Sequence, residues 1–136
     1  MKTLIIFYSY TGHAKALAQA LAAKESANIM EIKDTQRPGA LKAYTSGCYA
    51  SIRGKSWAIE PLSENLAAYE RLILFSPVWA NNPPPAVNAF LEKLPKNKTV
   101  AIKMVSASGR SGCKDRVTDA LKTKGCSLES FEDLKS

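Results

Sequence analysis

Short runs of apolar residues alternate along the chain with segments in which apolar residues recur every three or four positions. An uninterrupted apolar run is typical of a strand buried on both faces, and spacing of three and four is typical of one side of a helix. The runs predict strands at 3–8, 28–33, 71–76, 99–105 and 126–132. The spacing predicts a helix after the first, third and fourth of these strands, and a further helix at 40–52 within the irregular segment 34–66.

Strands that alternate with helices predict an α/β fold, namely a doubly wound, five-stranded parallel sheet. The length of 136 residues favours a single domain over residues 1–136. Ligands of such sheets bind beyond the carboxyl ends of the strands. Loops 9–14, 77–82 and 106–112 each leave such an end, and we expect them to converge on one site.

The turn after the first strand is rich in hydroxyl groups and opens an amphipathic helix. Backbone N–H groups and the hydroxyls of Ser9 and Thr11 would converge there on the positive end of the helix dipole, which suits a phosphate. Thr11 is the expected N-cap. The buried side of the helix is predicted at Ala14, Leu17, Ala18, Leu21 and Ala22.

Two of these loops resemble those of flavodoxins and flavodoxin-like proteins. Residues 9–14 are similar to the family's phosphate loop, S/T-x-T-G-x-T, and residues 75–87 look like its second flavin loop, in which Pro, a hydrophobic residue and Trp precede a Pro-rich helix start. The resemblance covers nearly the whole chain. It implies the strand order 2-1-3-4-5 and FMN bound without a covalent link.

The resemblance also implies a set of cofactor contacts. The first loop would hold the phosphate, Trp79 would stack on the isoalloxazine, the backbone of Ala80 and Asn81 would approach N5, and the third loop would contact the pyrimidine side. The candidate cofactor-binding residues are Ser9, Tyr10, Thr11, Gly12, His13, Ala14, Pro77, Val78, Trp79, Ala80, Asn81, Ser106, Ala107, Ser108 and Gly109.

The chain departs from the family pattern at several positions. Ala14 stands where a hydroxyl residue is common, and His13 is either an extra positive charge for the phosphate or a surface residue. Residues 106–115 contain no aromatic side chain, which leaves one flavin face open or covered by a partner. We also expect the domain to lack the family's final helix. Lys103 within an apolar strand fits a sheet face that stays wet or is covered by a partner, such as a second copy in a homodimer.

The net charge indicates which classes of ligand and partner to expect, and the cysteines indicate the redox compartment. The net charge of +7 favours anionic ligands or acidic redox partner proteins, and neither a nucleic-acid motif nor an apolar stretch long enough to span a membrane is evident. Three widely spaced cysteines predict reduced thiols in a cytoplasm. Cys113, at a helix start, is either an inert thiol or one with a lowered pKa.

Three functions fit this sequence. The first is a small FMN-binding electron-transfer protein, for which no catalytic residue or metal site is predicted. The second is an FMN-dependent NAD(P)H:quinone-type reductase, with Arg110 as an anion clamp. The third is a cofactor-free interaction module. Gly54, Lys55 and Ser56 match only the tail of a P-loop, and the lone His13 has no acidic neighbour in sequence, so triphosphate binding and a Ser-His-Asp hydrolase are disfavoured.

Overall fold

A computed structural model describes residues 2–136 and places five parallel strands in one sheet, in the order β2-β1-β3-β4-β5. The predicted fold class and strand order are therefore confirmed. The strands are β1 (Thr3–Phe7), β2 (Asn28–Glu31), β3 (Arg71–Pro77), β4 (Thr99–Ser106) and β5 (Ser127–Lys135).

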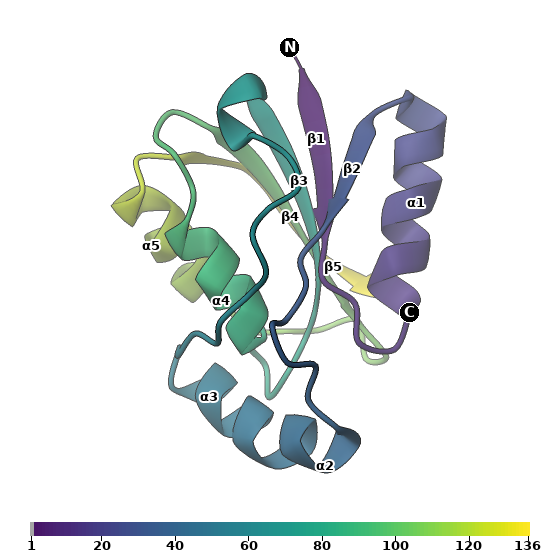
Figure 1. The fold of residues 1–136 in the computed structure, drawn as a ribbon, viewed down its shortest axis with the longest axis vertical. Helices are drawn as coiled ribbons and strands as arrows, with labels where there is room; N and C mark the ends of the chain where they lie inside the picture. The colour runs from purple at the N-terminus through teal and green to yellow at the C-terminus, as the bar shows by residue number, and fades with distance from the viewer. Residues whose placement is uncertain (1) are drawn as a thin grey trace.

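Helices lie on both faces of this sheet (Figure 1). Helix α1 (His13–Glu25) covers one face, and α4 (Pro85–Glu92) and α5 (Lys114–Thr123) cover the other. The predicted helix at 40–52 is present in three consecutive pieces: α2 (Ala40–Lys42), a π-helical turn η1 (Ala43–Gly47) and α3 (Cys48–Ile52). It lies beyond the carboxyl ends of the strands, and a 3-10 turn, η2 (Leu66–Ala68), precedes β3.

Two apolar clusters hold these layers together. On the α4 and α5 face, the cluster includes Leu4, Ile6, Leu72, Leu74, Phe90 and Leu121, and on the α1 face it includes Ile5, Phe7, Ile73, Phe75, Ala14 and Ala18. Adjacent residues of β1 and β3 thus supply opposite faces, as the pleat of a strand requires. Strands buried on both sides explain the continuous apolar runs in the sequence.

Helix α1 differs from its prediction in two details. Its N-cap is Gly12 at φ 101° rather than Thr11, because the turn needs a left-handed residue that only glycine adopts without strain. Its buried side consists of Ala14, Ala18 and Ala22, whereas Leu17 is 36% exposed. Small residues on the inner side allow the helix to lie close to the bulky side chains of β1 and β3.

The last strand is longer than predicted, because β5 continues to Lys135 and pairs with β4 as far as Ser106. Its polar residues pair across strands on the α1 side of the sheet: Arg71 forms two hydrogen bonds with Glu129, and Lys103 forms an ion pair with Glu132. Within residues 2–136 no helix follows β5. Every helix in that range is too short or too polar to cross a bilayer.

Candidate functional site

The three loops predicted to converge meet around one cavity of about 300 Å³ at the carboxyl ends of β1, β3 and β4. Its walls come from four separate stretches of chain. They consist of Ser9, Tyr10, Thr11, His13, Ala14, Pro77, Val78, Trp79, Val105, Ser106, Ala107 and Ser136. Five of the candidate residues, Gly12, Ala80, Asn81, Ser108 and Gly109, belong to the same loops but do not line the cavity.

The first loop forms the polar end of the cavity. The Gly12 N–H donates to Ser9 Oγ at 3.0 Å, which closes the turn and brings His13 and Ala14 to the first turn of α1. First-turn N–H groups have no acceptor within their own helix, and no acidic residue stands in this turn to compete for them. Together with the exposed Thr11, these donors suit a phosphate group.

A residue that the sequence did not reveal holds this loop in place. Arg37 Nη2 donates to the Tyr10 carbonyl at 2.6 Å, and the guanidinium lies 4.5 Å from the centre of the Tyr10 ring. The Tyr10 hydroxyl in turn donates to the Pro38 carbonyl at 2.8 Å. Arg37 therefore adds positive charge behind the loop. Its position in the irregular segment 34–66 gave no periodic signal by which it could have been found.

The second loop carries Trp79 on a tight turn. Trp79 and Asn82 exchange backbone hydrogen bonds of 2.8 and 3.0 Å across Ala80 and Asn81, whose φ values are 50° and 66°. Two consecutive left-handed residues define a type I′ turn, which is uncommon for alanine. Val78 and Trp79, which precede the turn, line the cavity, whereas Ala80 and Asn81 do not.

The Trp79 indole is fixed by its neighbours. The rings of Tyr8, Tyr10 and Trp57 meet it edge-on, with centroid separations of 6.1, 5.7 and 6.5 Å. Gly47, in the π-helical turn, lies so close that a Cβ there would be 2.6 Å from a Trp79 ring carbon. Trp79 thus has a preorganised position between the cavity and the 40–52 helical segment. Trp57 thus packs against Trp79 and close to Gly47.

The third loop is held in shape by hydrogen bonds to the hydroxyl of Ser106, its first residue. Ser106 Oγ accepts hydrogen bonds from the N–H groups of Gly109 and Arg110, at 3.0 and 3.2 Å. Ser106 and Ala107 line the cavity, whereas Arg110, the suggested anion clamp, does not. Val105 and Ser136 are wall residues absent from the candidate set. Ser136 reaches the site because its N–H donates to the Ser106 carbonyl at 2.8 Å. The parallel pairing of β4 with β5 brings these two residues together, and a prediction of that pairing as far as the end of β5 would have placed Ser136 here.

A buried hydrogen bond lies beneath the aromatic residues. The Tyr8 hydroxyl donates to Asp34 Oδ2 at 2.6 Å, and Asp34 Oδ1 has no hydrogen-bond partner. Burial raises the pKa of the Asp34 carboxyl, although its bond to Tyr8 and the charges of Arg37 and Lys42 act in the opposite direction. Burial and this carboxyl also raise the pKa of Tyr8 well above its usual range. Tyr8 itself is buried and belongs to the core on the α4 and α5 face.

Two further features bear on the candidate chemistry: the environment of Cys113 and the grouping of possible metal ligands. Burial raises the pKa of the Cys113 thiol, and the side chain is buried, which favours the inert interpretation of this cysteine. Across residues 2–136 no group of three or more His, Cys, Asp or Glu side chains is placed to hold a metal ion.

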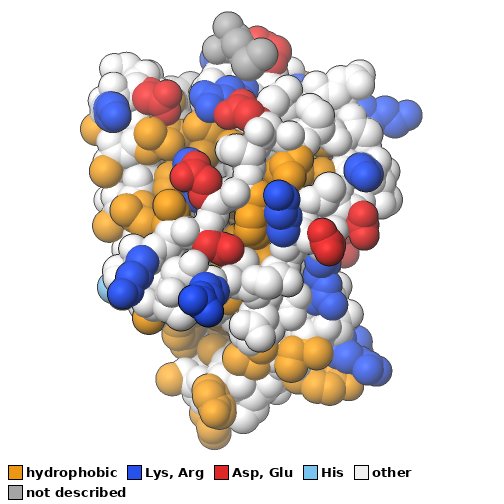
Figure 2. Space-filling view, turned by 180° about the vertical axis from the view of Figure 1, so that it is seen from behind, with side chains coloured by type: hydrophobic (Ala, Val, Ile, Leu, Met, Phe, Trp, Pro, Cys, Tyr) orange, Lys and Arg blue, Asp and Glu red, His pale blue; other side chains and the backbone are white. Residues whose placement is uncertain are grey.

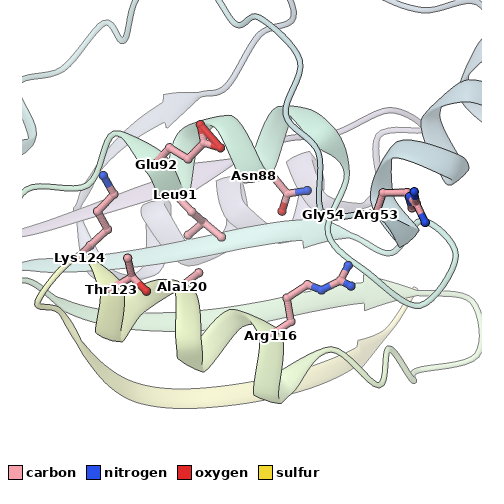
Figure 3. A pocket seen from close by; sticks show the side chains of 9 residues that line it. All are labelled: Arg53, Gly54, Asn88, Leu91, Glu92, Arg116, Ala120, Thr123 and Lys124. Atoms are coloured by element: carbon pink, nitrogen blue, oxygen red, sulfur yellow. The ribbon is translucent and has the colours of Figure 1, made fainter.

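A second cavity, of about 350 Å³, lies between α4, α5 and the loop after α3 (Figure 3). Its polar side chains hold that loop: Arg116 donates to the carbonyls of Ser51 and Ile52 at 2.7 and 2.9 Å, and Asn88 donates to the carbonyl of Lys55 at 2.9 Å. Although this cavity is the larger one, it lies away from the strand ends, and these donors already have acceptors. It is a structural groove.

Comparison with known proteins defines the class of the molecule. A flavoprotein from Lactobacillus acidophilus, solved in complex with FMN, superposes with a TM-score of 0.79 at 20% identity over 96% of this chain and 91% of its own. Oxidised flavodoxin 1 from Bacillus cereus gives 0.58 at 19% identity, over 100% of this chain and 86% of its own. The fold is therefore that of the flavodoxin-like proteins. No curated protein matches the sequence.

The family follows from the sequence itself. Residues 2–131 match the family described as NADPH-dependent FMN reductase. The chain belongs to this family, and the match confirms FMN as the cofactor predicted from the two loops. The donor set of the first loop and the indole on the adjacent wall fit a phosphate that is attached to a flat aromatic system.

Proposed function

We propose that the protein binds FMN in the cavity at the strand ends and transfers electrons between redox partner proteins. The observation that supports this most directly is the meeting of a phosphate-type helix start and a fixed tryptophan around one cavity. When bound, FMN would supply the chemistry of accepting and donating electrons. The protein would supply position, electrostatics and access.

Each wall has its own part in this proposal. The N–H groups of His13 and Ala14 and the hydroxyls of Ser9 and Thr11 would bind the phosphate, with the positive end of α1 opposing its charge. Trp79 would orient the ring system by offset stacking, because its own neighbours prevent it from turning. The third loop would bound the cavity on the side of β4 and β5.

Reductase activity is the second candidate, and the family description itself favours it. In that case the protein would take a hydride from NAD(P)H and pass the electrons to a quinone or a free flavin. The third loop carries no aromatic residue that would cover a flavin face, so a nicotinamide ring could approach the flavin from that side. Anaerobic mixing of the FMN-loaded protein with NADPH separates the candidates, because only the reductase bleaches the flavin absorbance within seconds.

The binding site can be tested by titrating the protein with FMN and with riboflavin, which lacks the phosphate. We expect FMN to bind much more tightly, and Thr11→Val to weaken FMN but not riboflavin. Thr45→Val is the matched control, since the Thr45 hydroxyl donates to a backbone carbonyl on an exposed helix turn. Equal affinity for the two flavins would refute the phosphate site, and a protein that binds neither would favour the cofactor-free module.

Trp79 has a separate test in the same titration. Trp79→Ala should weaken FMN and riboflavin alike by roughly fivefold, because aromatic stacking contributes about 1 kcal/mol beyond burial. Trp79→Phe should restore most of the affinity. Unchanged binding in Trp79→Ala would remove this residue from the proposed site.

The cellular setting remains part of the proposal. Cys48, Cys113 and Cys126 are all free thiols, which is consistent with a reducing cytoplasm. The redox partners would be acidic proteins, given the net charge of +7.

A further inference from the structure

The helical segment 40–52 has its large and small residues on the unexpected sides. Ala43, Gly47, Ala50 and Ser51 face the protein and are buried. Leu41, Tyr44, Tyr49 and Ile52 face solvent, with exposed fractions of 78, 79, 55 and 53%. A surface helix ordinarily buries its large apolar residues, and clustered exposed ones mark an interaction site. These four residues are called the apolar patch below.

The segment that carries the apolar patch is basic in sequence, and Asp34, which precedes it, is half-buried and bonded to the Tyr8 hydroxyl. Residues 35–59 contain four basic side chains, Arg37, Lys42, Arg53 and Lys55, and no acidic one. Both salt bridges found within residues 2–136 lie elsewhere, on the sheet face beside α1. The four cations instead lie 4.5 to 5.8 Å from aromatic ring centres. Figure 2 shows orange and blue side chains together at this end of the molecule.

The apolar patch is connected to the proposed cofactor site. Gly47, on the inner side of the same segment, contacts Trp79, and Lys42 lies 5.3 Å from the ring centre of Trp57, which meets Trp79 edge-on. The four basic side chains named above are called the cationic rim below. Arg37, one of the four, connects this rim to the first loop because it donates to the Tyr10 carbonyl. A molecule bound on the patch would therefore lie next to the walls of the cavity.

We propose that the apolar patch and its cationic rim form the docking surface for a redox protein whose own contact surface is acidic around an apolar centre. This inference rests on the proposed electron-transfer function, and it adds where the partner binds and which charge it has. A second copy is disfavoured because each copy has a net charge of +7 and would present four cations to four cations.

The test uses two haem proteins of opposite charge as electron acceptors: cytochrome b5, which is acidic, and cytochrome c, which is basic. Reduced FMN-loaded protein gives one electron to each ferric haem, so one fully reduced flavin reduces two haems. Stopped-flow rates at low ionic strength should favour the acidic acceptor. Added salt should slow the reduction of cytochrome b5, and it should leave the rate of cytochrome c reduction unchanged or increase it.

Matched variants locate the surface. Reversing Lys42, Arg53 and Lys55 to Glu should slow reduction of cytochrome b5 by about tenfold or more. Reversing Lys24, Lys93 and Lys122 to Glu changes the net charge equally at the opposite end of the helices, and should slow it by less than about threefold. Leu41→Ser with Tyr44→Ser tests the apolar centre, and it should slow the reaction at high salt, where steering is screened.

The possible results distinguish a wrong docking surface from a wrong electron-transfer function. If the FMN-loaded protein reduces cytochrome b5, but the two triple variants slow this reaction equally, the docking surface is wrong and the electron-transfer function stands. Binding of the wild type, but not of Leu41→Ser with Tyr44→Ser, to vesicles of phosphatidylserine would replace the protein partner with a membrane. A dimer in sedimentation velocity that Tyr44→Ser dissociates would replace it with a second copy.

Discussion

Gly47 has no side chain, and the Trp79 ring occupies the space that a side chain would take. Gly47→Ala places a Cβ 2.6 Å from the Trp79 ring, so the helical segment or the indole must move. We expect the free energy of unfolding to fall by about 1–3 kcal/mol and FMN to bind more weakly. Urea unfolding and FMN titration measure the two effects.

The matched control is Gly39→Ala, since a Cβ at Gly39 meets no atom within 4 Å. This variant should keep the FMN affinity of the wild type. If Gly47→Ala behaves in the same way, the contact with Trp79 does not position the indole.

At the scale of elements, the alanine side of α1 determines how closely the helix approaches the sheet. Ala18 is fully buried against β1 and β3, so Ala18→Leu should cost about 1–3 kcal/mol through overpacking. Leu17, which the helical spacing assigned to the interior, is 36% exposed, and Leu17→Gln should cost less than about 1 kcal/mol. Urea unfolding of both variants tests the assignment, and a larger loss in Leu17→Gln would reverse it.

The ion pair between Arg71 of β3 and Glu129 of β5 makes the free energy of unfolding depend on pH. Arg71 lowers the pKa of Glu129 in the folded protein, so the pair contributes stability above the unfolded pKa of Glu129 and loses it as the pH falls through the folded value. Both side chains are about a third exposed, so Glu129→Gln should cost only about 0.5–1 kcal/mol at neutral pH.

That cost should disappear in acid, because wild-type Glu129 is then protonated as well. Urea unfolding at about pH 7 and about pH 2 gives the comparison. A difference between wild type and Glu129→Gln that persists in acid would show that the ion pair is not its source.

At the scale of the whole molecule, the net charge acts on the cofactor. Reduced flavin is anionic, and a chain with net charge +7 should stabilise it by Coulombic attraction. The more negative of the two one-electron potentials should therefore be less negative than in acidic flavodoxins. Raising the salt concentration should lower it by tens of millivolts through screening, on the order of 1 kcal/mol. Redox titration in low and high salt measures this shift, and a potential that does not depend on salt would contradict it.

The sequence predicted the features that depend on local order. Apolar runs located all five strands, and the three loops at strand ends located ten of the twelve residues that line the cavity. The missing features depend on residues that are distant in sequence. Arg37 reaches the first loop from the irregular segment, Ser136 reaches the third loop through strand pairing, and the inverted sides of the 40–52 helix follow from the space beside Trp79. No periodicity encodes such contacts.

Ser9 and Ser136 lie on walls of the same cavity, although almost the whole chain separates them. β1 is synthesised before β5, and the wall that contains Ser136 forms only when β5 pairs with β4. The cavity is therefore complete only once these two distant segments have come together. FMN should accordingly favour the fully paired sheet over any partly folded state that lacks β5, and so act as a ligand that closes the sheet.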